Sequence, residues 1–207
     1  LIDGARHIVG HRAATAALGA MATHRFMYGM CTAMIVMLSR YHFADSAENA
    51  LDVASLVLAT SGVGYALAVV LTPWATERFG IDTWIPIMLA TAGALSFALC
   101  VSFQQWGFAV GGFVLGLAGQ SIKICADTRV QRDIEDVYLG RAFSIYDMLF
   151  NGTYVIAAAL AAALLPADGR SMLVLGLITA GYLGGAVVYR MVTPGDRSRT
   201  PLPSSRS

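Results

Sequence analysis

The sequence predicts an all-α membrane protein with six transmembrane helices. Hydrophobic residues make up 57% of the 207-residue chain and charged residues 13%, whereas roughly 25% of the residues in a soluble domain are charged. The mean hydropathy is +0.63, and six long apolar stretches alternate with short polar segments. A soluble protein, which is the alternative, would have almost no residues left to cover six such helices.

The six stretches span residues 16–38, 51–72, 84–103, 107–125, 141–165 and 171–192. About 20 residues of α-helix cross a hydrocarbon layer of about 30 Å. Backbone inside the bilayer must satisfy its own hydrogen bonds, which only helices and closed barrels achieve. Barrel strands would be about ten residues long with an alternating pattern, so each stretch is expected to be a helix.

The stretches differ in the residues that interrupt them. In chain order, the first contains Arg25, the second Gly62 and Gly64, the third no charged residue, the fourth Lys123, the fifth Asp147, and the sixth no charged residue before Arg190. Small residues recur four apart as Gly112 and Gly116, as Gly176, Ala180 and Gly184, and as Gly181 and Gly185. This interval lets helix backbones approach closely in lipid and predicts a compact bundle.

The segments outside the stretches have a different composition. Residues 1–15 mix apolar and basic side chains, as in an amphipathic helix lying on the cytoplasmic face of a membrane. The chain starts at Leu1 without an initiator methionine or a signal-peptide pattern, so we expect it to be part of something longer. Residues 193–207 are rich in proline and serine and are predicted to form a disordered cytoplasmic tail.

The basic residues predict the orientation, because they resist translocation and stay on the cytoplasmic side. Only Arg40 and Arg170 fall on one side of the predicted bundle. Ten arginines fall on the other: Arg6, Arg12, Arg78, Arg129, Arg132, Arg141, Arg190, Arg197, Arg199 and Arg206. The sequence therefore predicts a multi-pass protein of the cytoplasmic membrane with both termini in the cytoplasm.

Several kinds of partner are not expected. The net charge is only +1 and the basic residues are spread over the loops, so nucleic-acid binding is not predicted. Cys31, Cys100 and Cys125 lie inside the stretches and are too scattered for a disulfide framework or a metal site. They are interpreted as small buried apolar residues, and no metal or cofactor is expected.

Two polar joints carry a resemblance to a known family. The first is Ser-Gly-Val-Gly at 61–64 followed by Thr-Pro-Trp-Ala-Thr-Glu-Arg-Phe-Gly at 72–80. The second begins with Gly-Gln-Ser-Ile-Lys at 119–123, continues to 134, and is followed by Gly-Arg-Ala-Phe-Ser at 140–144. These joints resemble those of the major facilitator superfamily, specifically the drug and siderophore exporters of bacteria. The first joint departs from the usual basic turn, because it keeps only Arg78 and adds Glu77 and Asp82.

The resemblance covers nearly the whole chain, but only as the C-terminal six-helix half of a twelve-helix transporter. It implies a missing N-terminal six-helix half as partner, and efflux of a small amphipathic or drug-like molecule by a proton-coupled antiporter. In such transporters two halves move around a site near the bilayer midplane. No ATP-binding loop motif is present, which is consistent with transport driven by an ion.

Polar residues inside the stretches are the candidate substrate and ion pathway, since an ionisable group there costs roughly 2.5–3.5 kcal/mol and usually faces a cavity. The candidates are Arg25 with His24, then Asp147, Asn151 and Tyr154, which share a helix face, and Gln120, which shares a face with Lys123 and Asp127. We expect Arg25 and Asp147 to neutralise one another in a central cavity. Alternatively, Arg25 lies at the interface and binds lipid phosphate, or Asp147 carries a coupling proton. Lys123 is expected to extend its amine toward the cytoplasmic interface.

The joint at 127–141 is expected to form a charged amphipathic helix that contributes to a cytoplasmic gate. The gate residues would be Arg78, Asp127, Arg132, Asp136 and Arg141. Exposed ion pairs are worth only about 0–1 kcal/mol each, so such a gate would open easily. An ordinary solvated loop is the alternative.

Two other functional classes were weighed. An intramembrane enzyme would need a nucleophile with a base, or a metal cluster, within the spans. His24 is the only histidine in a predicted span, and no Gly-x-Ser-Gly or His-x-x-x-His motif accompanies it, so the protein is not expected to be an enzyme. The remaining alternative is a six-helix membrane subunit without transport activity of its own.

Overall fold

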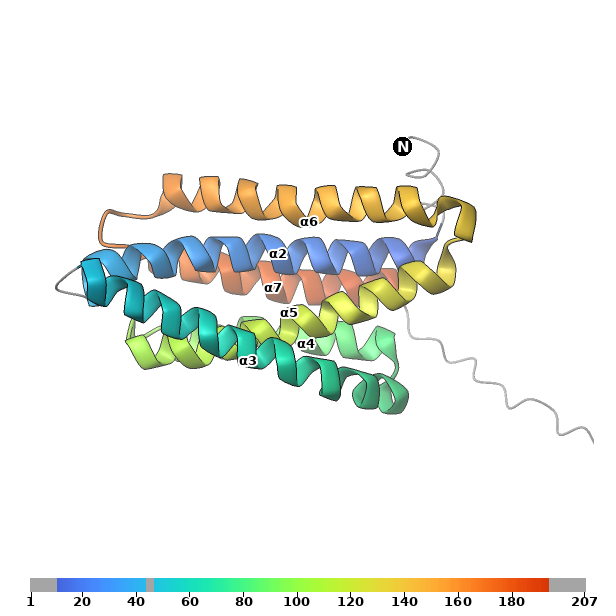
Figure 1. Cartoon of the computed structure of the whole chain (residues 1–207), viewed down its shortest axis with the longest axis horizontal. Coiled ribbons are helices and arrows are strands. Elements are labelled where there is room, and N and C mark those ends of the chain that lie inside the picture. Colours follow the sequence, from blue (N-terminus) through green and yellow to red (C-terminus); the bar gives the residue numbers. More distant parts are fainter. Residues whose placement is uncertain (1–10, 44–46, 194–207) are drawn as a thin grey trace, which may run out of the picture.

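The computed structural model describes residues 11–43 and 47–193, except for the side chains of 47, 48 and 136, and this part of the chain contains six long helices and no strand. The elements are α2 (Arg12–Leu38), the short π-helix η1 (Ser39–Phe43), α3 (Ala47–Phe79), α4 (Ile81–Cys100), α5 (Gln105–Asp133), α6 (Asp136–Leu164) and α7 (Met172–Val192). The long helices run up and down in one bundle, and α2 begins at the end where α7 finishes (Figure 1). The all-α prediction is confirmed.

Five of these helices are long and apolar enough to cross a membrane: α3, α4, α5, α6 and α7. The first predicted span, which lies in α2, does not reach the same level of hydropathy within the described residues. Two of its central positions are His24 and Arg25, which lower its hydropathy. Length and composition therefore support five of the six predicted spans.

The core forms around α2, which packs against α5, α6 and α7. Three of its methionines, Met21, Met30 and Met34, are almost completely buried. Helix α4 lies against α5 and α7, and α3 packs mainly on α5. Because α2 is surrounded by other helices, less of its surface needs to be compatible with lipid, and polar residues can be accommodated there.

Helices α3 and α6 lie on opposite sides of the bundle in Figure 1, and each leaves an apolar side uncovered. Only 11% of the residues in the most apolar stretch of α6 are buried, against 67% in α5. Val155 and Ile156 on α6 and Val63 and Val70 on α3 are exposed. Apolar surface of this extent is covered by lipid or by another part of the protein.

The glycine pattern correctly predicted two helix contacts. A Cβ added at Gly112 would lie 2.8 Å from the carbonyl oxygen of Val57 in α3, and one at Gly116 would collide with the Ser61 backbone. A Cβ at Gly185 would lie 2.8 Å from Cγ2 of Thr23 in α2. The prediction was wrong for Gly176 and Gly184, where an added Cβ would meet nothing within 4 Å.

The predicted amphipathic helix at 127–141 is not a separate element. Helix α5 continues to Asp133 and α6 begins at Asp136, so only two residues connect them. No glycine or proline occurs between residues 120 and 139 to end the helix earlier. The charged residues of this joint therefore lie on the ends of two long helices.

The two flanking predictions lie largely outside the described residues. Of the N-terminal segment, Arg12 and the residues after it belong to α2, and 1–10 are outside. Of the predicted tail, only Thr193 is described. Both proposals stay predictions.

Candidate functional site

Three aromatic rings of α6 line its contact with α2 and α5. Tyr146, Phe150 and Tyr154 are spaced four apart, which places them along one side of a helix; we call them the aromatic row. The rings of Tyr146 and Phe150 are stacked, with centroids 6.1 Å apart and planes inclined by 8°. Two basic side chains from other helices lie over this row.

Arg25 of α2 is the closer of the two. Its guanidinium carbon lies 3.7 Å from the centroid of Phe150 and 5.0 Å from that of Tyr154. Its Nε donates to the carbonyl oxygen of Phe150 over 3.5 Å, which is a long hydrogen bond. The side chain is half-buried, so this cation is held against aromatic faces and remains accessible.

The expected pair between Arg25 and Asp147 is not formed. Among the described side chains, no carboxylate lies within ion-pair distance of Arg25, and Asp147 is exposed. Asp147 follows Tyr146 directly and is therefore rotated about 100° around α6 from that ring. Asn151 is also exposed, and its amide donates over 3.0 Å to the backbone oxygen of Asp147. Of the three predicted residues of α6, only Tyr154 meets Arg25.

Lys123 of α5 lies at the other end of the row. Its Nζ is 5.7 Å from the centroid of Tyr146 and 2.8 Å from Oδ2 of Asp127. Lys123 and Asp127 are four residues apart in the favourable range for a helical ion pair, and each neutralises the other. Gln120, one turn earlier on α5, is half-buried.

His24 is inside the core and not on an open surface. The side chain is 2% exposed, and its Nδ1 lies 3.0 Å from the hydroxyl oxygen of Tyr182 in α7. Its ring stacks on Tyr28 with centroids 5.8 Å apart. Nε2 has no hydrogen-bond partner among the described residues, and it lies against Gly119, where an added Cβ would collide with the ring.

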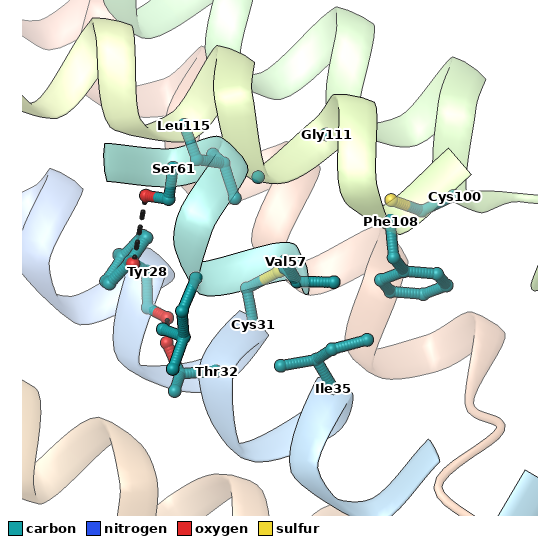
Figure 2. Close-up of a pocket in the computed structure, with 12 residues that line it drawn as sticks. Tyr28, Cys31, Thr32, Ile35, Val57, Ser61, Cys100, Phe108, Gly111 and Leu115 are labelled. Carbon is teal, nitrogen blue, oxygen red and sulfur yellow. Dashed lines mark hydrogen bonds between the residues drawn. The ribbon is translucent and has the colours of Figure 1, made fainter. Parts of the chain in front are cut away.

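A small pocket lies between α2, α3 and α5 (Figure 2), where the Tyr28 hydroxyl and the Ser61 Oγ are 3.2 Å apart. Cys31 and Cys100 lie on its wall. The cavity measures about 20 Å³, which is enough for a single water and too little for a drug-sized molecule. All three cysteines are free, in agreement with their interpretation as apolar residues.

An ion pair at one end of the bundle was not anticipated from the sequence. Arg129 of α5 pairs with Oδ2 of Asp82 in the first turn of α4, and both side chains are partly buried. The hydroxyl of Tyr189 in α7 donates to the other carboxylate oxygen over 3.1 Å. One carboxylate thus links three helices. The signal that could have found it is that Asp82 and Arg129 both fall at the predicted cytoplasmic ends of their helices.

Among the side chains that the structure describes, the residues proposed for the gate form no ion pair with one another. Arg78, Arg132 and Arg141 are exposed and form no ion pair among the described side chains. Asp127 pairs with Lys123 of its own helix. Asp136 begins α6, but its side chain lies outside the described part.

Comparison with known proteins decides the family. The profile of the Major Facilitator Superfamily matches residues 17–206, which is nearly the whole chain. The chain belongs to the major facilitator superfamily. Membership agrees with the prediction of a multi-pass membrane protein, since helices α3 to α7 are long and apolar enough to cross a membrane.

Two curated relatives support the assignment to the major facilitator superfamily. Both are described as uncharacterized MFS-type transporters, one from Mycobacterium bovis and one from Mycobacterium tuberculosis. Each is 36% identical over 197 residues, which cover 92% of this chain and 43% of the relative. The chain thus spans less than half the length of these relatives. No solved structure matches it.

Proposed function

We propose that this chain is the C-terminal half of a secondary transporter that exports a small molecule across the cytoplasmic membrane in exchange for protons. The observation that carries the proposal is the coverage: the family profile extends over nearly all of the chain, whereas the relatives are more than twice as long as the region they share with it. The remainder of a relative has room for a second half of similar size.

The architecture supports α2 as the sixth membrane crossing. Helix α2 has 27 residues, which at 1.5 Å per residue is long enough to span the bilayer. It is parallel or antiparallel to the five apolar helices in the same bundle (Figure 1). We assign the end that holds Arg78, Arg132 and Arg141 to the cytoplasm, because basic residues remain on that side.

The uncovered sides of α3 and α6 support a second half. Transporters of this type bind substrate between two repeats near the midplane, so a half must present both apolar surface and polar groups to its partner. Helix α6 does this, since its exposed Val155 and Ile156 lie about one turn beyond Asn151 and two turns beyond Asp147. We assign the substrate and ion pathway to Arg25, Asp147, Asn151, Tyr154 and Gln120.

Asp147 is the residue to which we assign the coupling proton. Its side chain is exposed, and it belongs to α6, which is long and apolar enough to cross the membrane. Carboxylates inside membrane helices are the typical proton carriers of pumps and transporters. The exposed Arg78, Arg132 and Arg141, which form no ion pair among the described side chains, would pair with carboxylates of the second half as a gate.

Inverted membrane vesicles test the function. Vesicles carrying the intact protein, energised by respiration, should accumulate at least one dye from a panel of cationic, neutral and anionic fluorescent amphiphiles. A protonophore should abolish accumulation, and vesicles with residues 1–207 alone should not accumulate the dye. Accumulation by this chain alone would disprove the half-transporter role, and no protein-dependent accumulation of any dye would favour a subunit without transport activity.

A further inference from the structure

The charges within the helices are not evenly balanced. Lys123 is neutralised by Asp127, and Arg129 by Asp82. Among the described side chains, Arg25 has no carboxylate within ion-pair distance. The positive charge of Arg25, near the middle of the central helix α2, is therefore left unpaired among the described side chains.

The immediate surroundings of Arg25 stabilise the cation without satisfying its hydrogen bonds. The faces of Phe150 and Tyr154 attract the guanidinium, at 3.7 and 5.0 Å from their centroids. A guanidinium has five N–H donors, and the bond recorded within the described part uses only Nε, over 3.5 Å to Phe150. Its two terminal nitrogens thus remain available for an acceptor.

From this geometry we propose that Arg25, held on Phe150 and Tyr154, binds the anionic group of the substrate, which is a carboxylate, sulfonate or phosphate attached to an aromatic or apolar body. This inference deepens the proposed transport function. Anion binding at Arg25 does not depend on that function, but the identification of the anion as the substrate does. The planar guanidinium matches the two oxygens of such a group. The rings of Phe150 and Tyr154 restrict the guanidinium in advance and offer an apolar wall next to it.

The opposite assignment, a cationic substrate, is less well supported by the surroundings. Asp127 is already paired with a cation of its own helix, and Asp82 is paired at the far end of α5. Asp147 is exposed on a different side of α6 from the rings that hold Arg25. A cation entering the space over the aromatic row would meet Arg25 first.

Two dyes with the same ring system provide the test. 8-Anilinonaphthalene-1-sulfonate and N-phenyl-1-naphthylamine differ in one sulfonate group. Binding of each to the intact purified transporter in maltoside micelles is followed by fluorescence titration. We expect the sulfonate dye to bind more tightly, and Arg25→Gln to weaken it at least about tenfold, the effect of losing a charge-assisted hydrogen bond, while binding of the neutral dye changes less than about twofold.

Matched variants complete the design. Arg25→Lys keeps the charge but loses the fork and should give an intermediate affinity for the sulfonate dye. Arg40→Gln removes an exposed arginine outside the proposed pathway and should keep the preference for the sulfonate dye. Circular dichroism melting identifies variants that fail to fold; if Arg25→Gln is one of them, the comparison of Arg25→Lys with wild type decides. No preference for the sulfonate dye, or a preference unaffected by Arg25, would overturn the proposal.

A lipid headgroup offers the same phosphate chemistry, and a third measurement separates the two sources. Addition of phosphatidylglycerol to the micelles should leave the affinity for the sulfonate dye unchanged. If the lipid displaces the dye and Arg25→Gln abolishes lipid binding, the ligand is a headgroup and the substrate assignment is wrong. If anion binding depends on Arg25 but the protein transports nothing, the anion site is supported and the transport function is wrong. If the dye is transported but transport does not depend on Arg25, the transport function is supported and the anion site is wrong.

Discussion

The hydroxyl oxygen of Tyr182 lies 3.0 Å from Nδ1 of His24, and this contact joins α7 to α2 in the middle of the buried core. The other ring nitrogen of His24 has no partner among the described residues. Tyr182 is therefore the hydrogen-bond partner of Nδ1, one of the two ring nitrogens of His24. Helix α2 can keep this polar side chain at its centre because α7 supplies the partner.

Replacement of this hydroxyl should destabilise the bundle. Tyr182→Phe leaves both ring nitrogens of His24 unsatisfied, which should lower the free energy of unfolding by about 1–3 kcal/mol. Reversible unfolding in mixed detergent micelles measures the change. Tyr41→Phe is the matched control, because Tyr41 is 61% exposed, and it should change stability by less than about 0.5 kcal/mol. Equal effects of the two substitutions would contradict the role of Tyr182.

Two glycines of similar sequence context should respond in opposite ways to alanine. A methyl group at Gly116 would collide with the backbone of Ser61 in α3, so Gly116→Ala should separate α5 from α3 and lower the yield of folded protein. At Gly184 an added Cβ meets nothing within 4 Å, and alanine there should stabilise the helix by up to about 1 kcal/mol. Fluorescence-detected size exclusion after heating compares the two variants. A stable Gly116→Ala protein would refute the close packing.

The ion pair between Asp82 and Arg129 should contribute measurably to stability. Removal of one partner from a fully buried pair costs about 3–5 kcal/mol, and because these side chains are 17% and 21% exposed we expect about 1–3 kcal/mol for Asp82→Asn. A double-mutant cycle with Arg129→Gln should give a clear coupling energy. The exposed Arg132→Gln should have almost no effect. Strict additivity of Asp82→Asn and Arg129→Gln would show that the pair is not energetically coupled.

The proposed orientation predicts which loops can be labelled from outside intact cells. In a protein without its three native cysteines, a single cysteine at Asp168 should react with a membrane-impermeant maleimide. A cysteine at Arg78 or Arg132 should react only after the membrane is permeabilised. Asp168 and Arg78 are both exposed, so accessibility within the protein is matched. Reaction at Arg78 in intact cells would reverse the orientation.

The helices could be predicted from the sequence because the length and apolarity of a membrane span are local properties. Every predicted stretch contains most of a helix of the structure, including α4, which covers Ile81–Cys100. The ends of the helices were less well predicted, since α5 and α6 extend beyond the apolar residues into charged segments. Hydropathy alone does not indicate where a helix ends within such a segment. The hydropathy of α2 could not reveal that it is the helix surrounded by the others.

Sequence reasoning named candidate residues for the site, but it could not give their contacts. Arg25 and Tyr154 do meet, but helical spacing alone could not show that Phe150 lies under the guanidinium or that Asp147 is exposed. Those facts depend on how far α6 is rotated about its axis against α2. Asp82 and Arg129 are 47 residues apart, and no periodicity relates two positions on helices whose packing is unknown.

Two different sets of contacts hold the helices of the bundle together. The carboxylate of Asp82 fastens α4, α5 and α7 together at one end, while α6 adheres mainly to α2 along the aromatic row. One carboxylate thus links α4, α5 and α7, whereas α6 packs mainly on α2. A tilt of α6 would move Phe150 away from the guanidinium, so binding of an anion at Arg25 and the tilt of α6 are thermodynamically linked.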